Sequence, residues 1–167
     1  NKPGLRAEDQ GFDDSLNMAG LLYLPEDHPD VVNAKREEDS IERMVWANAE
    51  YAAEFNGGGR FQPGGYLTDY YTDEALKVIE NNRNRPFFLY LPLTAPHTPW
   101  LPKEEFVGKS PAGEYGDFTM QVDQLVGRVF DYLKQENLLE HTLFIFSSDN
   151  GPVWFHADQE KYGHLST

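Results

Sequence analysis

Blocks of apolar residues alternate with polar stretches along the chain, and these blocks predict strands and helices. Two short runs, Phe87–Leu91 and Thr142–Phe146, hold almost no polar residue, which is typical of strands buried on both faces. Pro86 and Pro92 flank the first run, and Pro152 prevents the second from continuing. We therefore predict two buried strands in the second half of the chain.

The clearest helical periodicity lies in Glu114–Glu136. Its apolar residues recur at the spacing of an amphipathic helix that packs on a sheet, at Phe118, Val122, Leu125, Val126, Val129, Phe130 and Leu133. Three acidic residues of this region are expected to be solvated or to cap the helix: Asp117, Asp123 and Asp131.

Two other helices are predicted upstream. One should begin at Thr72, because Asp73 and Glu74 would then place negative charge at the positive end of the helix dipole. Its apolar face would hold Ala75, Leu76 and Ile79. The other should run from Ser40 to near Asn56, with the triple glycine at 57–59 as a connector and with an apolar face of Ile41, Met44, Val45, Ala49 and Ala52.

Strands separated by amphipathic helices favour an α/β fold with a parallel sheet. The two strands predicted with most support are fewer than the five or six, approximately, of a complete doubly wound sheet. We infer that further strands lie outside this sequence, or that Leu21–Leu24 and part of the tail after Pro152 contribute short ones.

The amino-acid composition limits the classes of molecule that the chain can bind. The chain has 167 residues, enough for one domain, and a formal net charge of −14, which argues against nucleic acid or an anionic membrane as a partner. A small anion is not excluded, because it responds to a few local groups. With no cysteine the chain has no disulfide and no thiolate metal site. No apolar run is long enough to span a bilayer.

Oxygen ligands follow the second predicted strand. Asp149 and Asn150 offer hard oxygen donors, and Gly151 permits a sharp turn below them. In an open α/β sheet, the carboxyl ends of the strands are where ligands bind. A metal site is one interpretation of these residues; an Asx turn that ends the strand is the other.

A histidine follows the first predicted strand. His97 lies between Pro96 and Pro99, and the prolines restrict the loop that holds it. A role in a site is one interpretation, and a helix cap or a core hydrogen bond is the alternative. Another histidine, His28, lies in an acidic, turn-like stretch and is expected to be a solvated loop residue.

If the two strands are parallel neighbours, His97 and the Asp149–Asn150 pair lie at the same edge of the sheet. A hard cation beside an imidazole suits hydrolysis of an anionic ester. The pair supplies too few oxygens for Ca²⁺, which takes about six to eight. From the residues alone, His97 and the Asp149–Asn150 pair therefore form only part of a hydrolytic metal site.

Several segments, in this order and spacing, resemble the sulfatase family of the alkaline-phosphatase-like superfamily. The main ones are residues 85–92 with Pro96-His97-Thr98-Pro99, and Ser147-Ser148-Asp149-Asn150-Gly151-Pro152. The helical stretch from Tyr115-Gly116-Asp117 to Val126-Gly127, together with Gly11-Phe12-Asp13 and Lys161-Tyr162-Gly163-His164, also resembles the family. The resemblance implies a partial alkaline-phosphatase-like sandwich, with parallel strands flanked by amphipathic helices.

The resemblance also implies a chemistry. Sulfatases hydrolyse sulfate esters with a formylglycine made in a C/S-x-P-x-R motif and with a divalent cation, usually Ca²⁺. Asp149 and Asn150 match the metal ligands, and His97 matches the histidine that contacts the sulfate and is a candidate acid. His164 lies where some members place a substrate-facing residue. The expected substrate is a sulfate-ester small molecule or a sulfated glycan, and the expected location is periplasmic or extracellular.

Some of the family's residues are missing. The chain has no C/S-x-P-x-R motif. By comparison with the family, it also lacks the early Asp pair that completes the metal shell, the active-site Lys and His that precede the segment resembling Gly11-Phe12-Asp13, and the lysine expected after Thr167. It also begins at Asn1 without a methionine. We therefore expect residues 1–167 to be the middle part of a single catalytic domain, truncated at both ends, with the formylglycine in the missing N-terminal part. The isolated chain should be inactive.

Two alternatives stay open. The first is a phosphodiesterase or phosphonate monoester hydrolase of the same superfamily, because sulfate and phosphate esters need similar sites. The second is a non-catalytic binding module that uses the acidic surface and the loops of Trp100 and Trp154.

Overall fold

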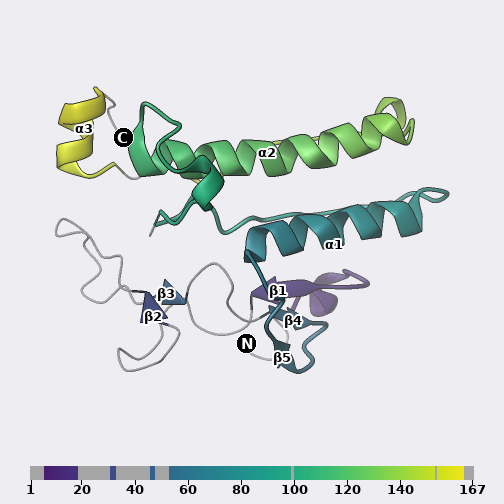
Figure 1. Cartoon of the computed structure of the whole chain (residues 1–167). Helices are drawn as coiled ribbons and strands as arrows, with labels where there is room; N and C mark the ends of the chain where they lie inside the picture. The colour runs from purple at the N-terminus through teal and green to yellow at the C-terminus, as the bar shows by residue number, and fades with distance from the viewer. Residues whose placement is uncertain are drawn as a thin grey trace.

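The computed structural model describes residues 6–18, 31–32, 46–47, 53–98, 100–152 and 154–163. Two long helices dominate it, α1 (Leu67–Asn82) and α2 (Gly113–Gln135), and Figure 1 shows them side by side. A short helix α3 (His156–Tyr162) follows near the C-terminus. The single-turn 3₁₀ helices are η1 (Glu8–Gln10), η2 (Glu104–Phe106) and η3 (Leu139–His141).

The helices α1 and α2 run parallel. Their cross-helix contacts follow the same order on both: Thr68 with Gln121, Asp73 with Arg128, Glu80 with Tyr132, and Arg83 with Glu136. Between them lies a core in which Ile79, Val129 and Leu133 are buried. The apolar spacing predicted from the sequence therefore forms the interface, and the helix predicted over Glu114–Glu136 is confirmed to within a residue at each end.

The predicted start of α1 is wrong. The helix begins at Leu67, and Thr72 is an interior residue whose hydroxyl donates to the Thr68 carbonyl oxygen at 2.9 Å. The extra turn forms because Leu67 and Tyr71 pack on Ala53 of the neighbouring sheet. Tertiary packing here overrides a local capping signal.

Short strands surround the N-terminal end of α1. The sheet β1-β4-β5 is antiparallel and consists of β1 (Leu16–Met18), β4 (Ala53–Phe55) and β5 (Arg60–Phe61). A second antiparallel pair joins β2 (Val31–Val32) to β3 (Trp46–Ala47).

The helix predicted from Ser40 to Asn56 is wrong where the structure describes it. Residues 46–47 and 53–55 are strands, because each pairs with a strand distant in the sequence, at Val31–Val32 and at Leu16–Met18. The glycines at 57–59 do connect two elements, namely β4 and β5.

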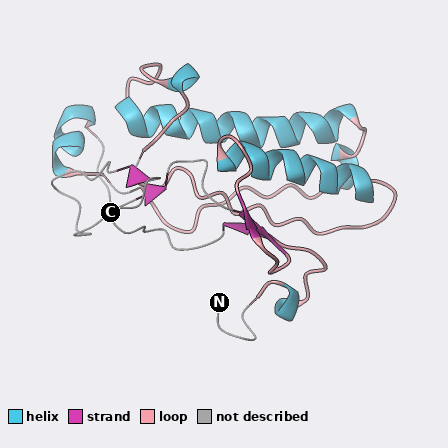
Figure 2. Ribbon diagram, turned by 60° about the horizontal axis from the view of Figure 1, so that its bottom comes forward, coloured by secondary structure: helices cyan, strands magenta, loops and turns pink. Residues whose placement is uncertain are grey.

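The two strands predicted at Phe87–Leu91 and Thr142–Phe146 are extended segments without a ladder. Figure 2 shows both as loops that run side by side beneath the helices, and within the described residues neither pairs with a strand. The prediction that both faces are buried is also wrong, because Phe88, Tyr90, Leu143 and Ile145 are exposed. The physical reason is the missing neighbour: a buried strand needs a sheet around it. The expected parallel sheet is not formed within the described part of the chain.

The tail holds more structure than the sequence predicted. Trp154 and Phe155 are buried, and α3 follows them. The stretch Leu21–Leu24 and His28 lie outside the described residues. Across the described residues, no helix has both the length and the apolar composition of a membrane span.

Candidate active-site edge

His97 lies in the loop that joins the extended segment after α1 to η2. Its side chain is exposed, and its backbone N–H donates to the Thr94 carbonyl oxygen at 3.2 Å, which closes a turn. The Ala95–Pro96 peptide bond before it is cis.

The His97 ring is oriented by its own loop. Its Nδ1 lies 2.7 Å from the carbonyl oxygen of Thr98. A carbonyl oxygen only accepts hydrogen bonds, so Nδ1 carries the hydrogen in this contact. This contact lies within the exposed loop.

Asp149 and Asn150 lie in a bend directly after the second extended segment, and both are exposed. Serine hydroxyls support the bend: Ser148 Oγ donates to the Asn150 carbonyl oxygen at 2.6 Å, and Ser147 Oγ donates to the Ser148 carbonyl oxygen at 3.3 Å. The two candidate side chains are therefore not what closes this turn.

An aromatic cluster brings the two loops together. Ala95 and Trp100, on either side of His97, pack with Phe155 against the first half of α2. The ring of Trp100 lies 5.5 Å from that of Phe155 and 6.3 Å from that of Trp154. Because Trp154 follows Asn150 closely, the His97 loop and the chain just beyond Asp149–Asn150 meet at the N-terminal end of α2.

The described residues do not provide a complete set of ligands for a metal cation. Among the described residues no three His, Asp or Glu side chains converge as a metal-binding group. Asp149 and Asn150 contribute hard side-chain oxygens of the type that Ca²⁺ prefers, but fewer than the six to eight, approximately, that it takes. The pair fits a cation only as part of a larger set. His164 lies outside the described residues.

Two buried polar side chains hold the connection after the His97 loop, and the sequence interpretation did not single them out for this role. Gln121 accepts from the backbone N–H of Lys103 at 2.9 Å. Asp117, expected to be solvated or capping, is 2% exposed and accepts from the N–H groups of Gly108 and Ser110 at 2.8 and 2.7 Å. The sequence did contain a signal for their burial. Asp117 and Gln121 are one helical turn apart, and each directly precedes a residue of the apolar face, Phe118 and Val122.

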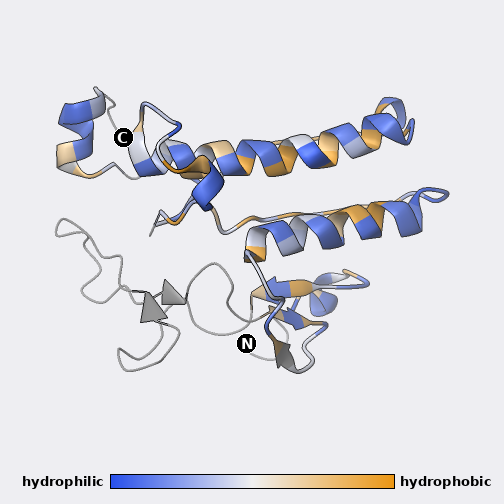
Figure 3. Ribbon diagram, viewed as in Figure 1, coloured by the Kyte–Doolittle hydropathy of each residue, from blue (hydrophilic) through white to orange (hydrophobic). Residues whose placement is uncertain are grey.

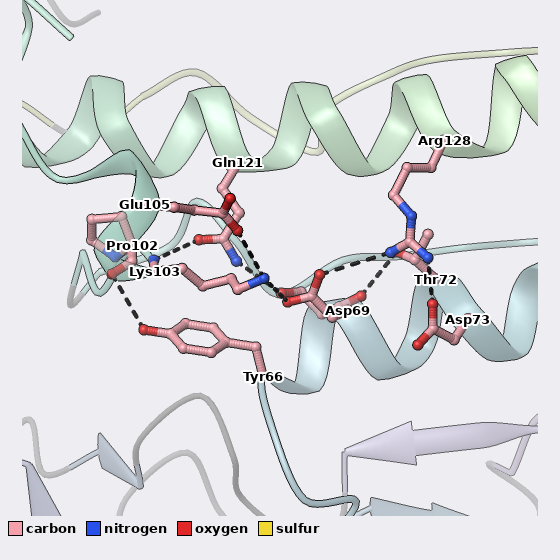
Figure 4. A network of polar contacts seen from close by, with 10 residues as sticks. Tyr66, Asp69, Thr72, Asp73, Pro102, Lys103, Glu105, Gln121 and Arg128 are labelled. Carbon is pink, nitrogen blue, oxygen red and sulfur yellow. Dashed lines mark hydrogen bonds and ion pairs between the residues drawn. The ribbon is translucent and has the colours of Figure 1, made fainter. Parts of the chain in front are cut away.

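Charged side chains tie the same connection to both helices, as Figure 4 shows. Lys103 Nζ lies 3.1 Å from Glu105 and 3.3 Å from Asp69, and these carboxylates raise the pKa of Lys103. Arg128 of α2 pairs with Asp73 and lies 3.8 Å from Asp69. The Tyr66 hydroxyl donates to the Pro102 carbonyl oxygen at 3.2 Å. The loop that carries His97 is thus anchored at its end.

Comparison with known proteins identifies relatives. The family model described as sulfatase matches residues 5–165. Arylsulfatase H of Homo sapiens is 46% identical over 78 residues, 47% of this chain and 14% of that protein. The N-acetylgalactosamine-6-O-sulfatase of Bacteroides thetaiotaomicron is 38% identical over 87 residues, 52% of this chain and 17% of that protein. The matches thus span a small part of the relatives' length.

Two solved structures are similar to this chain in fold. The crystal structure of Ps i-CgsB in complex with k-i-k-neocarrahexaose has a TM-score of 0.60 and 26% identity, over 83% of this chain and 32% of that one. A second structure, whose title concerns the metabolism of glycosaminoglycans by Bacteroides thetaiotaomicron, has a TM-score of 0.58 and 26% identity, over 90% of this chain and 33% of that one. Since the family model covers nearly all of the sequence, the chain belongs to the sulfatase family.

Proposed function

We propose that this chain is a segment of a sulfatase catalytic domain that hydrolyses sulfate esters, and that it supplies part of the active site at the N-terminal end of α2. The observation that carries the proposal is the aromatic cluster: it joins the loop of His97 to the chain just after Asp149–Asn150. In an α/β domain these loops belong to the edge where ligands bind.

In this proposal His97 contacts the sulfate and protonates the leaving oxygen. The contact of its Nδ1 with the Thr98 carbonyl oxygen orients the ring, and in this proposal Nε2 contacts the substrate. An imidazole suits both tasks, because its ring N–H groups donate to anionic oxygens and can pass a proton to the leaving oxygen.

Asp149 and Asn150 would hold a divalent cation, Ca²⁺ or a similar ion, together with oxygens from outside this segment. When bound, such an ion polarises the ester oxygens and neutralises their charge. The nucleophile, a formylglycine, would also come from outside these residues. His164, which lies beyond the described part, remains a candidate for contacting the substrate.

The substrate we favour is a sulfated glycan. One relative is named an N-acetylgalactosamine-6-O-sulfatase, and one structural neighbour holds an oligosaccharide. We expect the protein to encounter a sulfated oligosaccharide outside the cytoplasm, so we place the protein in the periplasm or outside the cell.

The test uses the whole protein encoded by the gene that contains these residues, assayed on 4-nitrophenyl sulfate and on sulfated oligosaccharides. The His97→Ala variant should lose about 100-fold or more in kcat/KM, the usual contribution of a general acid. His141→Ala is the matched control, because His141 is also exposed but lies in η3, beyond the C-terminal end of α2. Its activity should be unchanged.

Other outcomes separate the alternatives. Faster turnover of bis(4-nitrophenyl) phosphate than of any sulfate ester would favour the phosphodiesterase. Saturable glycan binding without turnover of either ester would favour the binding module. Full activity of His97→Ala would remove His97 from the site.

A further inference from the structure

Both polar groups of a single peptide bond, the one between Pro102 and Lys103, are held by side chains. The Lys103 N–H donates to Gln121 Oε1 at 2.9 Å, and the Pro102 carbonyl oxygen accepts from the Tyr66 hydroxyl at 3.2 Å. The N–H and C=O groups of a trans peptide point in opposite directions. Tyr66 directly precedes α1 and Gln121 belongs to α2, so the two side chains hold the peptide from opposite sides, as Figure 4 shows. We call this arrangement the peptide clamp.

The Gln121 side chain of the clamp is fully buried. Figure 3 shows apolar residues recurring along α2, and Gln121 is 0% exposed between the buried Phe118 and Leu125, each about one helical turn away. Its Nε2 donates to the Thr68 hydroxyl of α1 at 3.4 Å, so both polar atoms of the amide have a partner. A leucine here would extend the apolar face without the burial of a polar group. What the amide adds is a fixed position for the Lys103 N–H relative to both helices.

The chain between His97 and the clamp has little freedom. Pro102 fixes its own φ and favours an extended Leu101 before it. Trp100 is 8% exposed and packs in the aromatic cluster. On the other side, the His97 backbone N–H donates to the Thr94 carbonyl oxygen. A shift of the clamped peptide would therefore be passed on to the backbone of His97.

We propose that Tyr66 and Gln121 are positioning residues for the transfer of a proton to the leaving oxygen. They act by fixing the loop backbone that carries His97 rather than on the substrate itself. This inference rests on the proposed function, in which His97 is the general acid. A general acid contributes about 10²–10⁴-fold to the rate, and a misplacement of about 1 Å can cost about 100-fold. Loosening the clamp should remove part of that contribution.

The test compares two leaving groups in the whole protein encoded by the gene that contains these residues. Phenolate is strongly basic and needs a proton from the acid, whereas 4-nitrophenolate is weakly basic and leaves with little help. A smaller amount of folded enzyme lowers the apparent kcat equally for both esters. A displaced acid lowers kcat more for phenyl sulfate than for 4-nitrophenyl sulfate. The ratio of the two kcat values therefore separates positioning from folding.

Two variants open the clamp. Gln121→Met removes the acceptor for the Lys103 N–H and nearly keeps the size of the side chain. Tyr66→Phe removes one hydroxyl from a half-buried ring, so it decides the test even where Gln121→Met folds poorly. Each should lower the ratio of kcat on phenyl sulfate to kcat on 4-nitrophenyl sulfate by about 5-fold or more.

Two further variants are the controls. Gln121→Glu keeps a side-chain oxygen that accepts from the Lys103 N–H, and it should restore the ratio of the unchanged protein. Gln124→Met is the matched substitution at an exposed position of the same helix, and its ratio should be unchanged. A lowered ratio in Gln124→Met would count against the clamp, because this position is not part of it.

His97→Ala, measured on the same two esters, shows which proposal fails. If its ratio falls while Tyr66→Phe and Gln121→Met keep theirs, the clamp is overturned and the role of His97 stands. A lowered ratio in only one clamp variant would assign the positioning to that side chain alone and also overturn the clamp. If His97→Ala lowers kcat equally on both esters, or not at all, His97 is not the acid and both proposals fail. A whole protein that hydrolyses neither ester would also overturn both.

Discussion

Asp117 is the side chain on which the local structure after the His97 loop depends most. Its carboxylate is 2% exposed and takes two backbone N–H bonds, from Gly108 and Ser110. Both bonds are partly buried, and a hydrogen bond to a charged group contributes about 1.5–3 kcal/mol. Asp117→Ala should therefore lower the free energy of unfolding by about 2–4 kcal/mol in urea titrations followed by circular dichroism.

Asp123→Ala on the same helix is the control, because Asp123 is exposed. It should change the free energy of unfolding by less than about 0.5 kcal/mol. Equal effects of the two substitutions would show that the Asp117 bonds do not matter for stability.

Glu80 makes the helix pair sensitive to acid. The hydroxyl of Tyr132 donates to its carboxylate at 2.6 Å, and this bond, with Arg83 beside it, holds the pKa of Glu80 below its ordinary value of 4.5. The same bond raises the pKa of Tyr132 to about 12. The carboxylate is favoured in the folded state, so this stability is present above pH 4.5 and is lost as the pH falls through the lowered pKa.

Tyr132→Phe should therefore destabilise the chain at neutral pH, with a difference from the unchanged chain that shrinks in acid. Thermal melts at a series of pH values measure it. Tyr90→Phe is the control, since Tyr90 is exposed and donates to no carboxylate among the described residues. A Tyr132→Phe difference that stays constant down to strong acid would contradict this account.

At the scale of elements, α1 and α2 share a buried apolar core. Leu133 is 2% exposed and packs with Ile79 and Val129. Leu133→Ala should cost about 2–5 kcal/mol, because it removes buried methyl groups and leaves a cavity. Urea unfolding measures this loss.

Val78→Ala provides the comparison on α1, since Val78 is 38% exposed. It should cost less than about 1 kcal/mol. A smaller loss for Leu133→Ala than for Val78→Ala would mean that the two helices do not pack as described.

The elements differ in how far the sequence predicted them. α2 was predicted well because seven apolar positions share one helical face. The start of α1 was missed because packing of Leu67 on Ala53 adds a turn before Thr72. The helix predicted over residues 40–56 was wrong at residues 46–47 and 53–55, because these strands pair with partners far away in the sequence, which local periodicity cannot reveal.

At the scale of the whole molecule, we predict that the isolated 167 residues do not turn over 4-nitrophenyl sulfate. The described residues hold no converging set of three metal ligands, and the sequence contains no C/S-x-P-x-R motif to supply the nucleophile. A colorimetric assay with added Ca²⁺ measures this. The whole protein from the same gene is the positive control, and turnover by the isolated chain above the rate of a His97→Ala variant would contradict the prediction.

The sequence by itself determined the family resemblance, the α2 helix and the order of His97 and Asp149–Asn150 after two apolar runs, because these depend on residues close together in the chain. Only the tertiary structure decided that both runs are extended but unpaired, that Asp117 and Gln121 are buried, and that the two candidate loops meet at one end of α2. These features depend on which distant segments are present to pack and to hydrogen-bond, and a local pattern does not record that.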